Sequence, residues 1–221
     1  MKTSAFLLLP VAMMIYSARA FASEQDEAGV LWGVKASFDL NIPGKWHTPA
    51  GSISMYDPGY GFTLGGVCNI DLSKGFYLEP GLSFFYDTYK ADFITTNADG
   101  NVSRLGPTVS KAGIRVPVMV GYWFSIPDRF DLTVFTGPEV SYGFSGKVKL
   151  GDDHIVEDWN DNLYGNEGMQ RRFDAAWKVG LGAPINSLFV SIDAAIGITD
   201  LIPGAPSCRD NRASVSLTYY F

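Results

Sequence analysis

The sequence is poor in charged residues, and beyond its first segment it has no long apolar run. Charged residues make up 18% of its 221 residues, and 23 Asp and Glu outnumber 17 Lys and Arg. A nucleic-acid-binding protein would need a basic surface, so this class is excluded. After the N-terminal segment no run approaches the roughly 18 apolar residues that a transmembrane helix needs. Such a chain can cross a membrane only as a closed β-barrel.

Histidine and cysteine are also scarce, which argues against catalysis, a metal centre and disulfides. The two histidines, His47 and His154, both fall in expected loops. The two cysteines, Cys68 and Cys208, fall near opposite ends of the expected fold, too far apart for a disulfide. We therefore predict no catalytic, cofactor-binding or metal-binding residues, and two free thiols.

One acidic segment stands out from this low charge. Residues 151–161, "GDDHIVEDWND", bring several carboxylates together with His154 and Trp159. Clustered carboxylates suit hard cations, but the ligand spacing and turn glycine of a calcium loop are missing. We interpret the segment as a solvated surface loop and leave open whether it binds cations.

The N-terminal segment has the features of a cleaved secretory signal peptide. Lys2 precedes an apolar stretch, residues 5–16, that is too short to span a bilayer. Small residues at Ala18, Ala20 and Ala22 then provide cleavage sites. We predict a signal peptide over residues 1–22 and a single barrel domain over residues 23–221.

Past residue 29 the hydrophobic pattern repeats every second residue, which indicates strands. The expected strands are residues 30–40, 60–72, 76–86, 111–124, 130–143, 173–183, 188–198 and 212–221. Short turns and long connections alternate between them, with long connections at residues 41–59, 87–110, 144–172 and 199–211. This order predicts an all-β, eight-stranded, antiparallel up-and-down barrel that spans a membrane, with all its long loops at one end.

One face of every expected strand carries no charged residue, and the other face combines charges with many glycines. Small residues and opposed charges suit the narrow interior of an eight-stranded barrel, so we predict that the apolar face meets lipid. Six charges well inside their strands should form a salt-bridge network that plugs the lumen. These residues are Lys35, Glu79, Arg115, Glu139, Lys178 and Asp193. An ion-conducting lumen is the alternative.

Aromatic residues on the apolar face gather at the two ends of the strands. Such aromatic girdles mark the two membrane–water interfaces. At the short-turn end the predicted girdle is Trp32, Phe76, Tyr122, Phe124, Phe130, Tyr219 and Phe221. At the long-loop end it is Phe38, Tyr60, Phe62, Tyr86, Tyr142, Phe173 and Trp177.

Two prolines fall inside expected strands, Pro117 on the lumen face and Pro138 on the lipid face. Proline cannot donate a hydrogen bond to a neighbouring strand and usually marks a bulge or an edge. Because a closed barrel has no edge, we predict a local bulge at each proline.

The signal peptide, the eight alternating strands, the segments "GVKASFDLN" and "YLEPGLSFFYD" and the closing "SLTYYF" resemble the small outer-membrane β-barrel family. This group includes the OmpA- and OmpX-like barrels and domains labelled porin-family. The resemblance implies the outer membrane of a Gram-negative bacterium, insertion by the barrel-assembly machinery, and contact with outer-membrane lipid and lipopolysaccharide. It does not imply one biochemical activity.

We therefore expect a non-enzymatic protein that acts as a structural or surface-binding scaffold, with an unidentified extracellular ligand at its long loops. A narrow channel for small solutes is the alternative, followed by a lipid-modifying outer-membrane enzyme. We expect no cofactor.

The family resemblance also implies that a terminal aromatic residue is the signal read during insertion. Deleting Phe221 should therefore lower the yield of folded barrel more than deleting any one loop-tip residue. Heat-modifiable gel migration of membrane fractions measures that yield, and an unchanged yield would contradict the prediction.

Overall fold

The computed structural model describes residues 29–48, 51–54, 57–90, 93–96, 102–105, 108–126, 130–149, 163–164, 170–185, 187–200 and 209–221. The expected signal peptide, the acidic segment 151–161 and Cys208 lie outside the described residues. Of His47 only the backbone is described. Within these ranges no helix is long and apolar enough to cross a membrane.

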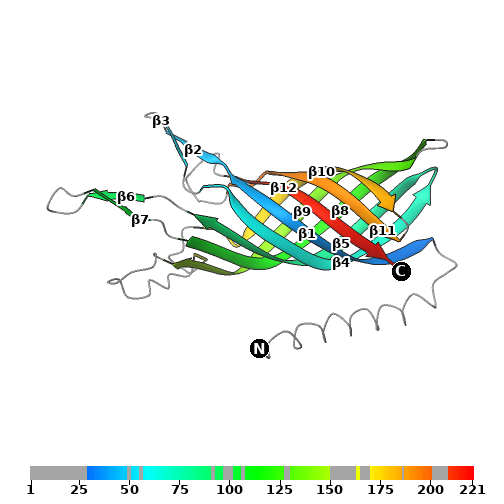
Figure 1. Ribbon diagram of the computed structural model, residues 1–221, viewed down its shortest axis with the longest axis horizontal. Helices are drawn as coiled ribbons and strands as arrows, with labels where there is room; N and C mark the ends of the chain where they lie inside the picture. Colours follow the sequence, from blue (N-terminus) through cyan, green and yellow to red (C-terminus); the bar gives the residue numbers. More distant parts are fainter. Residues whose placement is uncertain are drawn as a thin grey trace, which may run out of the picture.

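Eight strands form a closed antiparallel barrel, in which each strand pairs with its sequence neighbours and the last strand pairs with the first (Figure 1). The strands are β1 (Val30–Pro43), β4 (Gly59–Ser73), β5 (Phe76–Lys90), β8 (Thr108–Ile126), β9 (Phe130–Lys149), β10 (Phe173–Ile185), β11 (Leu188–Gly197) and β12 (Asp210–Tyr220). The expected fold class is confirmed.

Several strands continue further toward the long loops than the sequence pattern indicated. β5 runs to Lys90, β8 begins at Thr108 and β9 runs to Lys149. Two expected loops also contain hairpins, β2 (Lys45–Thr48) with β3 (Gly51–Ser54) and β6 (Phe93–Thr96) with β7 (Val102–Leu105). Both hairpins project beyond the loop end of the barrel (Figure 1).

Along most of each barrel strand, side chains alternate between the outside and the inside of the barrel wall. Along β1, Trp32 and Phe38 are exposed, whereas Lys35, Asp39 and Asn41 are buried. Phe38 has 57% of its surface exposed, although it lies in the middle of a regular strand. Apolar residues outside and charged residues inside are the reverse of a water-soluble barrel, and they indicate a wall that faces lipid.

The prediction of bulges at Pro117 and Pro138 was wrong. Pro117 pairs with Glu139 and Pro138 pairs with Trp177 without any shift of register there. A missing N–H removes one hydrogen bond but requires no extra residue, so the strands stay aligned on both sides of each proline. The bulge between β8 and β9 lies nearer the loops, between Ala112 and Gly113.

Two adjacent glycines in β4 show how closely the inner side of the wall is packed. A Cβ atom on Gly65 would lie 2.2 Å from the backbone oxygen of Leu82 and 2.4 Å from the Cα of Ser83. A Cβ atom on the outward-facing Gly66 would have only the oxygen of Gly33 nearby, at 3.9 Å. Only the first position therefore requires the absence of a side chain.

We predict that Gly65→Ala lowers the free energy of unfolding by about 1–3 kcal/mol, because the backbone of β5 must move to admit the methyl group. Gly66→Ala is the matched control and should leave stability unchanged. Urea unfolding in detergent micelles measures both variants. Equal stability of the two variants would show that the inner wall is not close-packed at Gly65.

Candidate functional site

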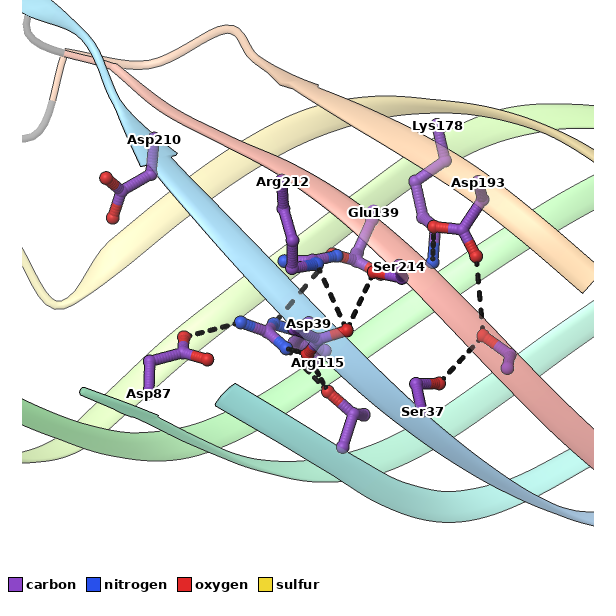
Figure 2. A network of polar contacts seen from close by, with 12 residues as sticks. Ser37, Asp39, Asp87, Arg115, Glu139, Lys178, Asp193, Asp210, Arg212 and Ser214 are labelled. Atoms are coloured by element: carbon purple, nitrogen blue, oxygen red, sulfur yellow. Dashed lines mark hydrogen bonds and ion pairs between the residues drawn. The ribbon is translucent and has the colours of Figure 1, made fainter. Parts of the chain in front are cut away.

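The centre of the lumen is crossed by a network of buried ion pairs (Figure 2). Arg115 of β8 reaches across the interior to Asp39 of β1 at 2.7 Å, and it pairs with Asp87 of the neighbouring strand β5 at 2.6 Å. Its guanidinium also lies over the ring of Phe85, 4.2 Å from the centroid. Arg115 thus connects strands that are not neighbours in the barrel wall.

Glu139 of β9 extends this network to the opposite wall. It accepts a hydrogen bond from Arg212 of β12, and Lys178 of β10 lies 3.4 Å from its second oxygen. Lys178 also pairs with Asp193 of β11 at 3.0 Å. Four of the six predicted lumen charges, Arg115, Glu139, Lys178 and Asp193, therefore belong to one connected network.

The other two predicted charges form a separate pair closer to the short turns. Lys35 lies 3.6 Å from Glu79, and Glu79 also accepts a hydrogen bond from the hydroxyl of Tyr220. The ammonium of Lys35 lies over the ring of Phe135, 5.6 Å from its centroid.

Three members of the central network were not among the six lumen charges predicted from the sequence. Asp39 and Arg212 lie in expected strands but were not among the six predicted lumen charges, and Asp87 was placed in the long connection 87–110. Extending the alternation of β5 from Glu79 through Ser83 to Asp87 would have put this carboxylate in the lumen.

A layer of large apolar and aromatic side chains fills the lumen on the short-turn side of the network. Tyr77, Met119, Phe135 and Phe189 form a buried cluster, against which Trp123 and Tyr220 pack. We call these six residues the aromatic layer. Glycines leave room for it: a Cβ atom on Gly121 would lie 2.1 Å from the ring of Tyr77. This layer was not predicted from the sequence. The sequence did contain a signal for it, because large aromatic residues occur on the same face of the strands as the inward-facing glycines.

The predicted girdle residues point outward wherever their side chains are described. Those that are exposed are Trp32, Phe38, Tyr60, Phe62, Phe76, Tyr86, Phe124, Tyr142, Phe173, Trp177 and Tyr219. Tyr122 and Phe221 are partly buried, and the side chain of Phe130 is not described. Beside the short turns, the ring of Tyr122 makes edge-to-face contacts with the rings of Phe76 and Phe124, and the ring centroids of each pair lie 4.7 Å apart. The position of all these girdle residues at the two membrane–water interfaces stays a prediction.

Three smaller predictions concern Phe221, the cysteines and metal binding. The backbone N–H of Phe221 donates to the oxygen of Trp32 at 3.0 Å, which ties the last residue to β1, and its role in assembly stays a prediction. Cys68 is a free thiol. Within the described ranges no group of three or more histidine, cysteine or acidic residues is arranged to hold a metal.

A closed antiparallel barrel with an apolar exterior and a charged, filled interior defines an integral β-barrel membrane protein. A family model described as "Outer membrane protein beta-barrel domain" matches residues 21–203. The chain belongs to this family, and it is a protein of the outer membrane of a Gram-negative bacterium.

Solved structures with similar folds share little sequence with this chain. The N-terminal barrel domain of OprF from Pseudomonas aeruginosa is 14% identical, over 86% of this chain and 97% of that one, with a TM-score of 0.33. OprG from the same organism is 9% identical, over 88% and 96%, with a TM-score of 0.42. Ail from Yersinia pestis is 11% identical, over 87% and 97%, with a TM-score of 0.38. Among curated protein sequences, none matches this chain significantly.

The central network predicts a large difference between two arginines. Replacing Arg115 by Met leaves Asp39 and Asp87 buried with one less cation, and should cost about 3–5 kcal/mol of stability. Arg209 pairs with Asp200 on the exposed surface, so Arg209→Met should cost less than about 1 kcal/mol. Unfolding in detergent micelles compares the variants.

A third variant separates lost charge balance from lost packing. Adding Asp39→Asn and Asp87→Asn to Arg115→Met removes the unpaired carboxylates and should recover part of the stability. If Arg115→Met and Arg209→Met unfold at the same urea concentration, the network does not stabilise the barrel.

Proposed function

We propose that this protein is a non-enzymatic outer-membrane scaffold whose lumen is closed and whose long loops bind a partner outside the cell. The observation that carries the proposal is the filling of the lumen by two different layers, one ionic and one aromatic. Each layer draws side chains from opposite walls of the barrel, so each one crosses the full width of the interior.

The two layers resist solute passage by different means. In the ionic network every charged group already has a partner of opposite sign, so a passing ion would have to displace a short ion pair. In the aromatic layer a passing ion would lose its hydration among side chains that are mostly apolar. An interior of eight strands is normally wide enough only for side chains. The alternative of a narrow solute channel would require both layers to move.

The chemistry of the described lumen also supports a role without catalysis. The hydroxyl of Ser214 donates to Asp39, and the hydroxyl of Ser216 lies 3.5 Å from Asp193. Each of these carboxylates already forms an ion pair with an arginine or a lysine, so neither serine has a carboxylate of its own. A lipid-modifying enzyme is therefore the less favoured function.

The proposed partners follow from the shape of the two ends and the outer wall. The exposed apolar wall suits lipid and lipopolysaccharide, and the closing pair of β1 with β12 suits assembly by the barrel-assembly machinery. The projecting β2–β3 and β6–β7 hairpins support binding of an extracellular ligand, since loops on a rigid scaffold carry recognition (Figure 1).

We predict that the purified protein, reconstituted in planar bilayers, shows no steady single-channel steps. The double variant Phe135→Ala and Phe189→Ala should also stay closed, because the ionic network still crosses the lumen. The matched control is Phe38→Ala with Phe62→Ala, two outward-facing rings. Steady steps from the unaltered protein, with insertion verified by heat-modifiable migration, would refute the closed lumen and favour the channel.

A further inference from the structure

The outer wall of the barrel is hollowed near its loop end, across strands β5, β8 and β9. The hollow has a volume of about 270 Å³. Its described lining residues are Tyr86, Ser110, Lys111, Ala112, Ser145 and Lys147. Tyr86 and Lys147 are exposed on the outside of the wall. Ala112 pairs with Tyr86 and with Ser145, and Ser110 pairs with Lys147. Since paired residues point to the same side of a sheet, the hollow opens outward and not into the lumen.

A β-bulge in β9 lies at the floor of this hollow. Gly113 of β8 pairs with Gly143, but the next residue toward the loops, Ala112, pairs with Ser145. Phe144 is therefore an extra residue in β9. A bulge bends its strand and changes the direction in which the following side chains point.

The extra residue exchanges the two sides of β9. Before the bulge, Glu139 and Gly143 are buried inside the barrel, whereas after it Gly146 is buried and Lys147 is exposed. An uninterrupted alternation would have placed Lys147 in the lumen. The same exchange brings Gly146 beneath Leu163, whose Cβ would lie 2.6 Å from a Cβ atom on the glycine. The bulge thus serves packing inside the barrel and moves a cation onto its outer wall.

Lys147 gives the hollow a positive charge. Lys111 contributes none on this side, because it is only 4% exposed and its ammonium lies 3.0 Å from Asp210 in the lumen. The described lining includes no carboxylate. Lys147 forms no ion pair with any described residue.

An exposed carboxylate at this end of the barrel stands elsewhere on the wall. Asp57 precedes β4, and its N–H donates to the oxygen of Lys90 at 2.8 Å, so it lies beside the end of β5. Strands β5 and β8 separate β4 from β9. Asp57 is therefore a neighbour of Lys90 and not of Lys147.

Hydroxyl groups add hydrogen-bond donors to this cation. Ser110 lies directly opposite Lys147 in the strand pair, and Ser145 precedes Lys147 by two residues on the same side of β9. A lysine ammonium binds phosphate as a point charge, and a hydroxyl can donate to a phosphate oxygen. One cation, two hydroxyls and no described carboxylate together favour an anion.

Exposed aromatic residues indicate the depth of the hollow in the membrane. Tyr142 and Phe144 are 42% and 49% exposed, and their ring centroids lie 5.8 Å apart on the short-turn side of Lys147. Aromatic rings on the outer wall gather at the membrane–water interface. Lys147 comes three residues, or about 10 Å of strand, beyond Phe144 toward the loops. The predicted girdle thus puts the ammonium of Lys147 at the level of the charged lipid headgroups.

We propose that this hollow binds a phosphate group of lipopolysaccharide in the outer leaflet. Lys147 neutralises the phosphate, Ser110 and Ser145 donate to its oxygens, and Tyr86 packs beside it. Long loops of such barrels face outside the cell, so the hollow meets the leaflet in which lipopolysaccharide is the anionic lipid. This site rests on the proposed contact of the outer wall with lipopolysaccharide and gives that contact a location.

The test uses the full refolded barrel, labelled with ¹⁵N, in micelles of an uncharged maltoside detergent. Diphosphoryl lipid A is titrated while the backbone amides of Ser110 and Ser145 are followed by NMR. The matched ligand is the same lipid with both phosphates removed, and phosphatidylglycerol is titrated as an anionic phospholipid. We expect a saturable shift with diphosphoryl lipid A, and a lower affinity at higher salt, because exposed charges are screened.

Lys147→Gln should weaken binding about fivefold, the effect of one cation near an anionic lipid surface. Lys147→Arg should retain the affinity. Ser110→Ala with Ser145→Ala should weaken binding although every charge is kept. The matched control is Lys74→Gln, which changes an exposed lysine in the short turn between β4 and β5 and should leave the affinity unchanged. Heat-modifiable migration verifies the fold of each variant.

Three results would overturn the site: no saturable shift, equal shifts with phosphate-free lipid A, or unchanged affinity in Lys147→Gln. Equal affinity for phosphatidylglycerol would overturn the assignment to lipopolysaccharide. Shifts of outer-wall amides by phosphate-free lipid A would still report contact between lipid and the wall, so a failed phosphate site is distinguishable from a failed lipid contact.

Discussion

Pairing of β1 with β12 is the constraint on which the rest of the structure depends. In a membrane, an unpaired strand edge would leave backbone N–H and C=O groups in hydrocarbon, where no water can satisfy them. The register from Gly33 with Tyr220 to Pro43 with Asp210 removes both edges at once. Once eight strands are closed in this way, the exterior must be apolar and the interior is too narrow to hold bulk water. The apolar exterior and the narrow, filled interior both follow from this one pairing.

The narrow interior explains why the ionic network and the aromatic layer lie at different depths. A charge is tolerated beside partners of opposite sign, and Arg115 or Glu139 reaches several such partners only where side chains converge from opposite walls. Rings need space instead, and glycines such as Gly121 and Gly182 provide it on the strands next to those of Tyr77 and Phe189. Lys35 is the junction, because it pairs with Glu79 and faces the ring of Phe135.

Much of this architecture could be predicted from the sequence because the side-chain period of a strand is two. The strands, their order and the inward position of residues such as Lys35 and Asp193 depend on that period alone. Partner choice within the lumen could not be predicted, since it depends on strand tilt and register across the barrel. The bulge at Ala112 was missed for a related reason: proline was a visible signal for irregularity, whereas the extra residue of β9 has no distinctive chemistry.

The lengths of several strands at their loop ends were also underestimated from the sequence, and this error has a functional meaning. The alternation weakens near Asp87 and Lys111 because polar residues there begin to occupy both faces, and a sequence pattern then indicates a loop. In the structure the pairing continues to Lys90 and Thr108. The barrel therefore carries a polar, rigid extension above its ionic network, built from regular strands rather than from flexible connections. Binding groups held on such strands keep their positions better than groups on loops. The loop half of the lumen thus combines regular strand pairing with buried polar side chains.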